Sequence, residues 1–457
     1  MASLVFFCSK PGSTRARAQT MQCIHRQPEF PLVMNKPFYL AHMSNFLPVL
    51  AFLLWIGVIP CWAQYTMPSE EFTHEGTWLQ WPHNFTYGSG AEDVESSWIQ
   101  MTAALTPGER VHIVAYNEDE AAHITQLLEN AEIDLGQVDF LLCPTDDFWV
   151  RDNGPIFVQG DNDEWVILDW GFNGWGGDAP YALDDAVPLA VAVDLEVPVI
   201  DLSVVVLEGG AIEVDGQGTL MATRSSITGD DRNPGLTESE IEAYFNSYLG
   251  IEQVIWLDGQ YGGNEDITDQ HIDGFVKFVG GNTMVTMEDA DLVYWYVSSA
   301  DRNIIDEATN ADGMPFTRVN LPLTQNPVQT TWGQSIGFRS SYVNYYVGNS
   351  VVLVPEYDDP MDAVALDIVQ GLYPERTAVG INCQNMLQWG GMVHCVTQQQ
   401  PLGATSLSLQ RPERFDAQGN TLGTFDVTGR AIQTLESGRL YIRRYEDGTS
   451  EKVLIWE

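Results

Sequence analysis

The sequence predicts an α/β protein built from repeated modules, each a β-hairpin followed by a crossover that carries a helix. The β-rich runs come in pairs joined by short turns, most of them containing glycine, which is typical of hairpins and not of a doubly wound sheet. A short polar motif precedes each pair, at similar intervals along the chain. Modules that recur in this way around an axis would bring their polar motifs to one central funnel.

Four hairpins are expected in order along the chain. Their strands are 156–158 with 165–168, 211–214 with 220–221, 275–279 with 284–287, and 345–347 with 351–354. The polar motifs before them begin at Arg151, Glu208, His271 and Ser341. The pair His394-Cys395 falls at the next interval, which predicts a fifth module.

Three helices are expected around these hairpins. Thr237 and Glu240 form a capping-box pattern that starts an apolar-periodic segment ending at Gly250. Segments 117–128 and 362–372 have a similar periodicity.

The charge balance limits the partners. The chain has 457 residues with 21 Lys+Arg against 63 Asp+Glu, a formal net charge of −42. Such a surface repels phosphate backbones, so no nucleic-acid partner is expected, and it attracts cationic ligands. Alternatively, the acidity serves only to keep an exported protein soluble.

Several side chains in the polar motifs are reactive types. Cys395 follows Gly390-Gly391 and would need a histidine or cationic neighbour to attack as a thiolate, unless it is a buried inert thiol. His271 and Asp273, two apart on a predicted strand, would share one face and could shuttle a proton and anchor a substrate. A surface hydrogen-bonded pair is the alternative.

Three carboxylates in one funnel would repel one another unless a cation lay between them. They are Asp152, Glu208 and Asp273, although Asp152 could simply pair with Arg151 and Glu208 could be a turn acceptor. A planar guanidinium fits such a cluster. A metal ion fits less well because the pattern lacks a second histidine and contains a thiol. The inferred chemistry is attack of Cys395 on a guanidinium carbon.

Residues 67–401 resemble the bacterial peptidylarginine deiminase/agmatine deiminase family of the guanidine-modifying pentein superfamily. The motifs that carry the resemblance are Met67-Pro68-Ser69-Glu70, Trp149-Val150-Arg151-Asp152-Asn153-Gly154-Pro155, Glu208-Gly209-Gly210, Arg232-Asn233-Pro234, His271-Ile272-Asp273, Ser341-Tyr342-Val343-Asn344-Tyr345 and His394-Cys395-Val396-Thr397.

The resemblance implies a five-bladed α/β-propeller (pentein fold) with no cofactor and no metal. It implies that Cys395 is the nucleophile, that His271 is the general acid/base, and that Asp152 and Asp273 grip the guanidinium. Trp149, Glu208 and Asn344 would line the substrate pocket.

The resemblance leaves the substrate's tail open between agmatine and peptidyl-arginine. The segment 172–177 resembles the agmatine deiminase branch, whereas the ends of the chain favour the peptidylarginine branch. Two motifs depart from the family pattern. Gln270 replaces a glycine before His271, and the family's Gly-Gly-Gly-Asn-Ile-His-Cys appears as Trp389-Gly390-Gly391-Met392-Val393-His394-Cys395. An amidinotransferase of the same fold and a non-catalytic secreted binding protein are the alternatives.

The two ends of the chain predict export. An apolar run at 46–63, ending in Cys61-Trp62-Ala63, predicts that residues 1–63 are a leader and signal peptide, with a membrane anchor as the alternative. Three cysteines follow it, so at least one cannot pair. Residues 64–402 are the expected deiminase domain.

The last segment, 403–457, is predicted to be a small all-β domain because it contains only short strand patterns and turns. Its Asp426-Val427-Thr428-Gly429-Arg430 and Gly438-Arg439-Leu440-Tyr441 resemble type IX secretion sorting domains. This resemblance implies secretion machinery as a partner, and a secreted or cell-surface protein.

Overall fold

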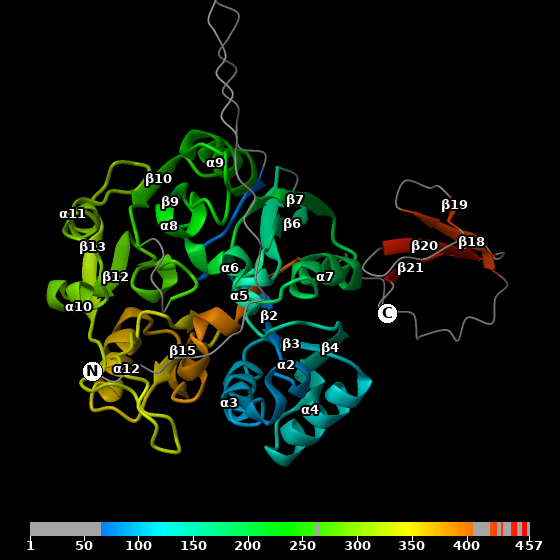
Figure 1. Ribbon diagram of the computed structural model, residues 1–457, viewed down its shortest axis with the longest axis horizontal. Helices are drawn as coiled ribbons and strands as arrows, with labels where there is room; N and C mark the ends of the chain where they lie inside the picture. The colour runs from blue at the N-terminus through cyan, green and yellow to red at the C-terminus, as the bar shows by residue number, and fades with distance from the viewer. Residues whose placement is uncertain are drawn as a thin grey trace, which may run out of the picture. The chain divides into compact units, whose positions relative to one another are not determined.

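A computed structural model describes residues 65–161, 163–260 and 266–404, together with the backbone of four strands between 421 and 454 (Figure 1). The predicted leader and signal peptide lie outside the described residues. Within the described residues, no helix is long and apolar enough to cross a membrane.

Small sheets of one repeated design make up the described region before residue 405. In the first, β5 (Ile156–Gly160) and β6 (Trp165–Gly171) form an antiparallel hairpin, and β7 (Val199–Val206) pairs with β6 in parallel. Three further sheets repeat this hairpin-plus-parallel-strand pattern. Their strands are β8 (Ile212–Val214), β9 (Thr219–Thr223) and β10 (Gln253–Leu257); β11 (Lys277–Val279), β12 (Thr283–Met287) and β13 (Thr317–Leu321); and β14 (Tyr346–Val347), β15 (Val351–Glu356) and β16 (Thr377–Asn382). All four predicted hairpins are confirmed.

A fifth sheet joins the two ends of this region. β17 (Gln398–Pro401) pairs antiparallel with β2 (His74–Gln80), and β3 (Arg110–Ala115) and β4 (Val138–Leu142) extend the sheet in parallel. The short strand β1 (Tyr65–Thr66) adds to the edge of β5. Hairpin-like pairing of β17 with β2 therefore completes the fifth module with strands more than 300 residues apart in sequence.

The crossovers carry the helices, as expected. The predicted helices are α4 (Glu118–Asn130), α9 (Glu238–Tyr244) and α12 (Asp362–Leu372). Both hydrogen bonds of the Thr237 capping box are present, and a π-helical turn extends α9 to Gly250, which ends it at φ +74°. The other helices are α2 (Asn84–Tyr87), α3 (Glu95–Leu105), α5 (Val150–Asn153), α6 (Gly174–Gly177), α7 (Val187–Leu195), α8 (Arg224–Ile227), α10 (Asp289–Tyr294) and α11 (Ser299–Glu307).

A short helical turn precedes the first strand of three of the hairpins and also strand β17, and polar motifs lie in or directly before these turns. The turns are α5 before β5, and the 3₁₀ turns η4 (Gly209–Ala211) before β8, η6 (Ile272–Gly274) before β11 and η8 (His394–Val396) before β17. Figure 1 shows α5 near the middle of the region that the five sheets surround. The fold thus places successive polar motifs at equivalent positions of successive sheets.

The expectation that His271 and Asp273 lie on a strand is wrong. His271 precedes the turn η6 and Asp273 lies within it, so strand β11 begins only at Lys277. The cause is local: the residues before His271 adopt left-handed backbone angles, with φ of +54° at Asp269 and +67° at Gln270. Extended backbone cannot pass through such a turn.

The C-terminal strands form an antiparallel sheet in the order β19-β18-β20-β21. They are β18 (Thr421–Asp426), β19 (Ala431–Ile432), β20 (Leu440–Tyr445) and β21 (Ser450–Leu454). Short strands were expected here, and the boundaries of the three predicted domains stay a prediction.

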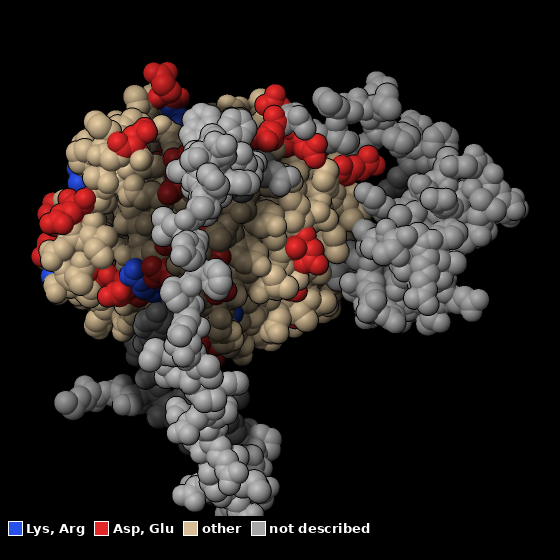
Figure 2. All heavy atoms as spheres, turned by 90° about the horizontal axis from the view of Figure 1, so that it is seen from above, with Lys and Arg blue, Asp and Glu red and all other residues tan. Residues whose placement is uncertain are grey.

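Acidic side chains are spread over the face shown in Figure 2, and Lys and Arg are sparse on it. This distribution agrees with the strongly negative formal charge of the chain.

Candidate active site

Three of the predicted site residues converge on the backbone of Gly210. A Cβ atom added there would lie 2.7 Å from Asp152 Oδ1, 2.7 Å from His271 Nδ1 and 3.2 Å from Asp273 Oδ2. The Gly210 N–H donates to Asp152 Oδ1 at 3.1 Å. Only a residue without a side chain lets these groups approach so closely, which explains the glycine in the Glu208-Gly209-Gly210 motif.

His271 is buried and pairs with a second carboxylate. Its Nε2 lies 2.7 Å from Glu208 Oε2, and its Nδ1 lies 3.6 Å from Asp152 Oδ1. Burial opposes the charged ring, but the charges of Asp152 and Glu208 and the Glu208 hydrogen bond outweigh it and raise the pKa of His271 to about 9. This direction favours the charged form of the ring, in which both nitrogens carry a proton.

Asp152 is placed to accept from a cation. The indole Nε1 of Trp175 donates to Asp152 Oδ2 at 2.9 Å. Burial, reinforced by the charges of Glu208 and Asp273, raises the pKa of Asp152 to about 6 although His271 opposes this. A cationic group beside Asp152 would stabilise the ionised carboxylate and so oppose this rise in its pKa.

The Cys395 thiol is half-buried beside two other predicted residues. Its Sγ lies 3.4 Å from Asn344 Nδ2 and 3.9 Å from Asp273 Oδ2. Burial and the negative charges of Asp273 and Asp152 raise the pKa of the thiol well above its usual value. The thiolate therefore needs an added positive charge to form. Cys143 and Cys383 are buried thiols without a disulfide bond.

Trp149 packs against the glycine-rich segment that leads to Cys395. It is 7% exposed, and its ring leaves no room for a side chain on Gly391, whose Cβ would lie 2.3 Å from it. Phe148 contacts Trp149 at a ring-centroid distance of 4.4 Å and Trp98 of the core at 5.0 Å. The aromatic core thus fixes the position of Trp149.

His394 lies between two carboxylates that sequence reasoning did not link to it. Its Nδ1 is 2.8 Å from Asp273 Oδ2 and its Nε2 is 2.7 Å from Glu70 Oε2. Glu70 also pairs with Lys277 at 3.1 Å and Arg151 at 3.4 Å. These cations and His394 overcome the effect of burial and hold the pKa of Glu70 well below its usual value. Contact with His394, together with the charge of His271, likewise lowers the pKa of Asp273 despite its burial.

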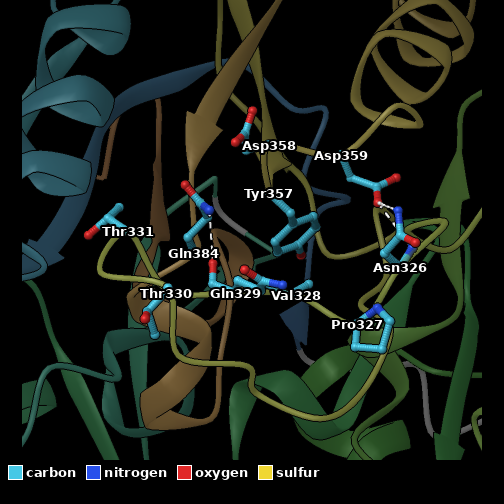
Figure 3. Close-up of a pocket in the computed structure, with 11 residues that line it drawn as sticks. Asn326, Pro327, Val328, Gln329, Thr330, Thr331, Tyr357, Asp358, Asp359 and Gln384 are labelled. Carbon is cyan, nitrogen blue, oxygen red and sulfur yellow. Dashed lines mark hydrogen bonds between the residues drawn. The ribbon is translucent and has the colours of Figure 1, made fainter.

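Two other features of the described residues could suggest a binding site, and both lie away from the predicted site residues. A cavity of about 520 Å³ lies between the segment 326–333 and the turn at 357–359, and none of the predicted site residues lines it (Figure 3). Among the described residues, Glu95, Glu120 and His123 bring possible metal-ligand atoms within 4.8 Å of one another, again away from the predicted site residues. Glu95 already accepts hydrogen bonds from Trp81 and His123.

Comparison with known proteins identifies the family. The family model for Porphyromonas-type peptidyl-arginine deiminase matches residues 66–401. The chain belongs to this family. An agmatine deiminase from Pseudomonas aeruginosa is 32% identical over 362 residues, which cover 74% of this chain and 95% of the relative. The solved structure of an agmatine deiminase from Enterococcus faecalis matches with 27% identity and a TM-score of 0.67, covering 76% of this chain and 98% of that one.

The resemblance inferred from the motifs is thus confirmed, and so is a mixed α/β fold of the pentein type. Gln270, the departure from the family's glycine, occupies a left-handed position with φ +67°. Its side chain donates to the Trp295 carbonyl oxygen at 2.9 Å, which helps to hold this strained conformation.

Five members of this deiminase's buried network were not chosen as site residues from the sequence. They are Glu70, Trp175, Arg232, Lys277 and His394. All of these except Lys277 stood inside segments quoted for the family resemblance, and that was the available signal. Nothing in the sequence distinguishes Lys277 from an ordinary strand residue.

Replacing Gly210 by alanine is expected to lower kcat/KM about 100-fold while the protein still folds. The added methyl group would displace Asp152 and His271 by about an ångström, and misplacement on that scale costs about this much. Ammonia release measures the activity, and the melting temperature measures folding. Gly371→Ala is the matched control because a Cβ on Gly371, in α12, meets nothing within 4 Å. Normal activity in Gly210→Ala would contradict the close convergence of the three side chains.

Proposed function

We propose that this protein is a guanidine deiminase that converts a guanidinium group to a ureido group and releases ammonia, with no cofactor. One observation carries the proposal. A thiol, a protonated histidine and two carboxylates, Asp152 and Asp273, surround a point where a cation is needed to offset their charge.

Substrate binding activates the nucleophile in this proposal. The guanidinium pairs with Asp152 and Asp273, and its positive charge lowers the pKa of the Cys395 thiol, which releases its proton to solvent and becomes a thiolate. The thiolate attacks the guanidinium carbon and forms a tetrahedral adduct. His271 gives its proton to the leaving nitrogen, so ammonia departs and an amidino-thioether remains on Cys395.

Hydrolysis reverses the role of His271. The neutral ring, still bonded to Glu208, takes a proton from a water molecule that attacks the amidino carbon. The hydroxyl of the resulting adduct then gives its proton to solvent as the C–S bond breaks, the ureido product leaves and the thiolate returns. An amine in place of this water would make the protein an amidinotransferase.

The arrangement of the sheets supports a closed ring. We infer that the five sheets form a five-bladed α/β-propeller whose axis passes through the site. The repeated sheet pattern and the pairing of β17 with β2 support this inference.

The buried cations favour substrates without a carboxylate near the guanidinium. Arg151 and Lys277 pair with Glu70, and Arg232 pairs with Glu208, all inside the protein. None of the three is left to bind a carboxylate of free arginine. Agmatine, or arginine within a peptide, is therefore the favoured substrate class.

The decisive test is turnover by the purified full-length protein. Agmatine, free arginine and peptides with internal or C-terminal arginine are compared by release of ammonia and of ureido product. Ureido product from agmatine or internal arginine supports the proposal. Transfer to an added amine indicates an amidinotransferase, and binding without turnover indicates a binding protein.

We also propose that the protein is exported and that residues 403–457 direct its secretion. A chain ending at Leu402 is expected to fold and keep full deiminase activity, because the site residues all precede it and β17 ends at Pro401. In a host with type IX secretion, the same truncation is expected to leave the protein in the periplasm. Fractionation and activity assays measure both. Secretion of the truncated chain would refute the role of residues 403–457 in export. Loss of its deiminase activity would refute the expectation that the catalytic domain folds without them.

A further inference from the structure

Arg232 lies directly behind the Glu208–His271 pair. Its Nε donates to Glu208 Oε1 at 2.6 Å, while His271 faces the other oxygen, Oε2, at 2.7 Å. The side chains of Arg232 and Glu208 are both 0% exposed. Each oxygen of this carboxylate therefore has its own cationic donor.

The two terminal nitrogens of the Arg232 guanidinium also have hydrogen-bond or ion-pair partners. One terminal nitrogen lies 3.1 Å from Asp231 Oδ2 and 3.2 Å from Asp269 Oδ2, and the other donates to the Ile267 carbonyl oxygen at 3.0 Å. Asp269 and Ile267 belong to the strained turn that leads into His271. Arg232 thus links the carboxylate partner of His271 to the backbone that presents His271.

We propose that Arg232 is a positioning residue for the proton transfers of His271: it fixes the orientation of Glu208 and balances its charge, so that the proton moves between His271 and the substrate. This inference rests on the proposed deiminase function and assigns a role to a side chain that does not touch the substrate.

The charge around His271 gives the reason. The groups that face it are Asp152 from α5, Glu208 before η4 and Asp273 from η6, all carboxylates. Arg232 supplies the cation nearest to Glu208. Without it, Glu208 would hold the shared proton more strongly and could rotate in the space left behind, so the proton would be harder to transfer.

Two substitutions separate charge from geometry in the full-length protein. Arg232→Met removes both, so kcat is expected to fall about tenfold or more, and the alkaline limb of the kcat/KM profile is expected to move to higher pH. This direction follows because losing a cation strengthens proton binding to the His271–Glu208 pair. Arg232→Lys keeps the charge, so kcat is expected to fall while KM and the alkaline limb stay near the wild-type values.

Arg224→Met is the matched control, since Arg224 pairs with Glu238 and Asp258 and does not contact Glu208. It is expected to leave kcat and the pH profile unchanged. The proposal would be overturned if Arg232→Lys had the wild-type kcat and the alkaline limb of the kcat/KM profile of Arg232→Met stayed at the wild-type pH. If Arg232→Met fails to fold, the Arg232→Lys kcat decides alone, because a purely structural arginine would leave kcat per folded molecule unchanged.

A titration without turnover separates this proposal from the deiminase function. Nitrogen-15 NMR of the His271 ring, assigned with His271→Asn, is compared between Cys395→Ser and Cys395→Ser with Arg232→Met. Proton loss from His271 at higher pH in the double variant supports the proposal even if no guanidine is turned over. An unmoved titration contradicts it whatever the wild-type enzyme does.

Discussion

Cys395→Ser is expected to lower kcat on agmatine or an arginine peptide by about 10⁴-fold or more, without a loss of folding. A hydroxyl is a far weaker nucleophile at this position, because the site that raises the pKa of the thiol would disfavour an alkoxide even more. Ammonia release by the purified variant measures the loss. Mass spectrometry of the acid-quenched wild-type reaction is expected to find an amidino adduct on Cys395.

Cys143→Ser is the matched control for this prediction. Cys143 is 0% exposed and belongs to an apolar core cluster, so a substrate cannot reach its thiol. Turnover per folded molecule is expected to stay at the wild-type level. An adduct on Cys143 or Cys383 in place of Cys395 would refute the assignment of the nucleophile.

Asp152→Asn is expected to lower kcat/KM by about 10²- to 10³-fold with a smaller loss of stability than Asp273→Asn. The amide leaves one of the two N–H donors to Asp152 without an acceptor, but it also removes a buried charge. The amide keeps the shape but lacks the anion that binds a guanidinium through two charged hydrogen bonds. The smaller loss of stability follows from the raised pKa of Asp152. Folding penalises the ionised carboxyl above its unfolded pKa, so this penalty is present at pH 7 and the amide removes it.

Asp273→Asn is expected to lose activity and also some stability, which makes it a useful contrast. The pKa of Asp273 is lowered in the folded protein, mainly through its contact with His394. Its ionised form therefore stabilises the fold above its unfolded pKa, and the amide loses that contribution at pH 7.

Melting temperatures and steady-state kinetics of both variants test these expectations together. Asp169→Asn serves as the control, since Asp169 is a half-buried carboxyl of β6 whose pKa is also raised, to about 7, outside the site. Near-normal kcat/KM in both Asp152→Asn and Asp273→Asn would rule out a guanidinium clamp.

Local patterns in the sequence predicted the four hairpins and three of the helices before residue 405. The hairpins followed from paired β-rich runs with short turns between them, and α9 followed from the Thr237–Glu240 capping box. These signals depend on neighbours within a few residues. The turn at His271 was missed because its left-handed angles occur at Asp269 and Gln270, where no glycine marks a turn.

The same local motifs singled out the reactive residues of the site. Cys395, His271, Asp152, Asp273 and Glu208 each stood in a short polar motif before a hairpin, at an interval that the fold repeats. By itself, therefore, the sequence determined the repeated α/β modules and the reactive residue types in the polar motifs before their strands. It also determined the family resemblance that the comparison confirms.

Only the tertiary structure decided how these groups are paired. His394 is bound by Glu70, 324 residues away, and Glu208 is shared between His271 and Arg232 from two other segments. Charges at such separations interact only after the modules have folded around a common buried region, where little solvent screens them. The physical reason is that pairing depends on distances of a few ångströms between side chains, and hairpin periodicity carries no information about them.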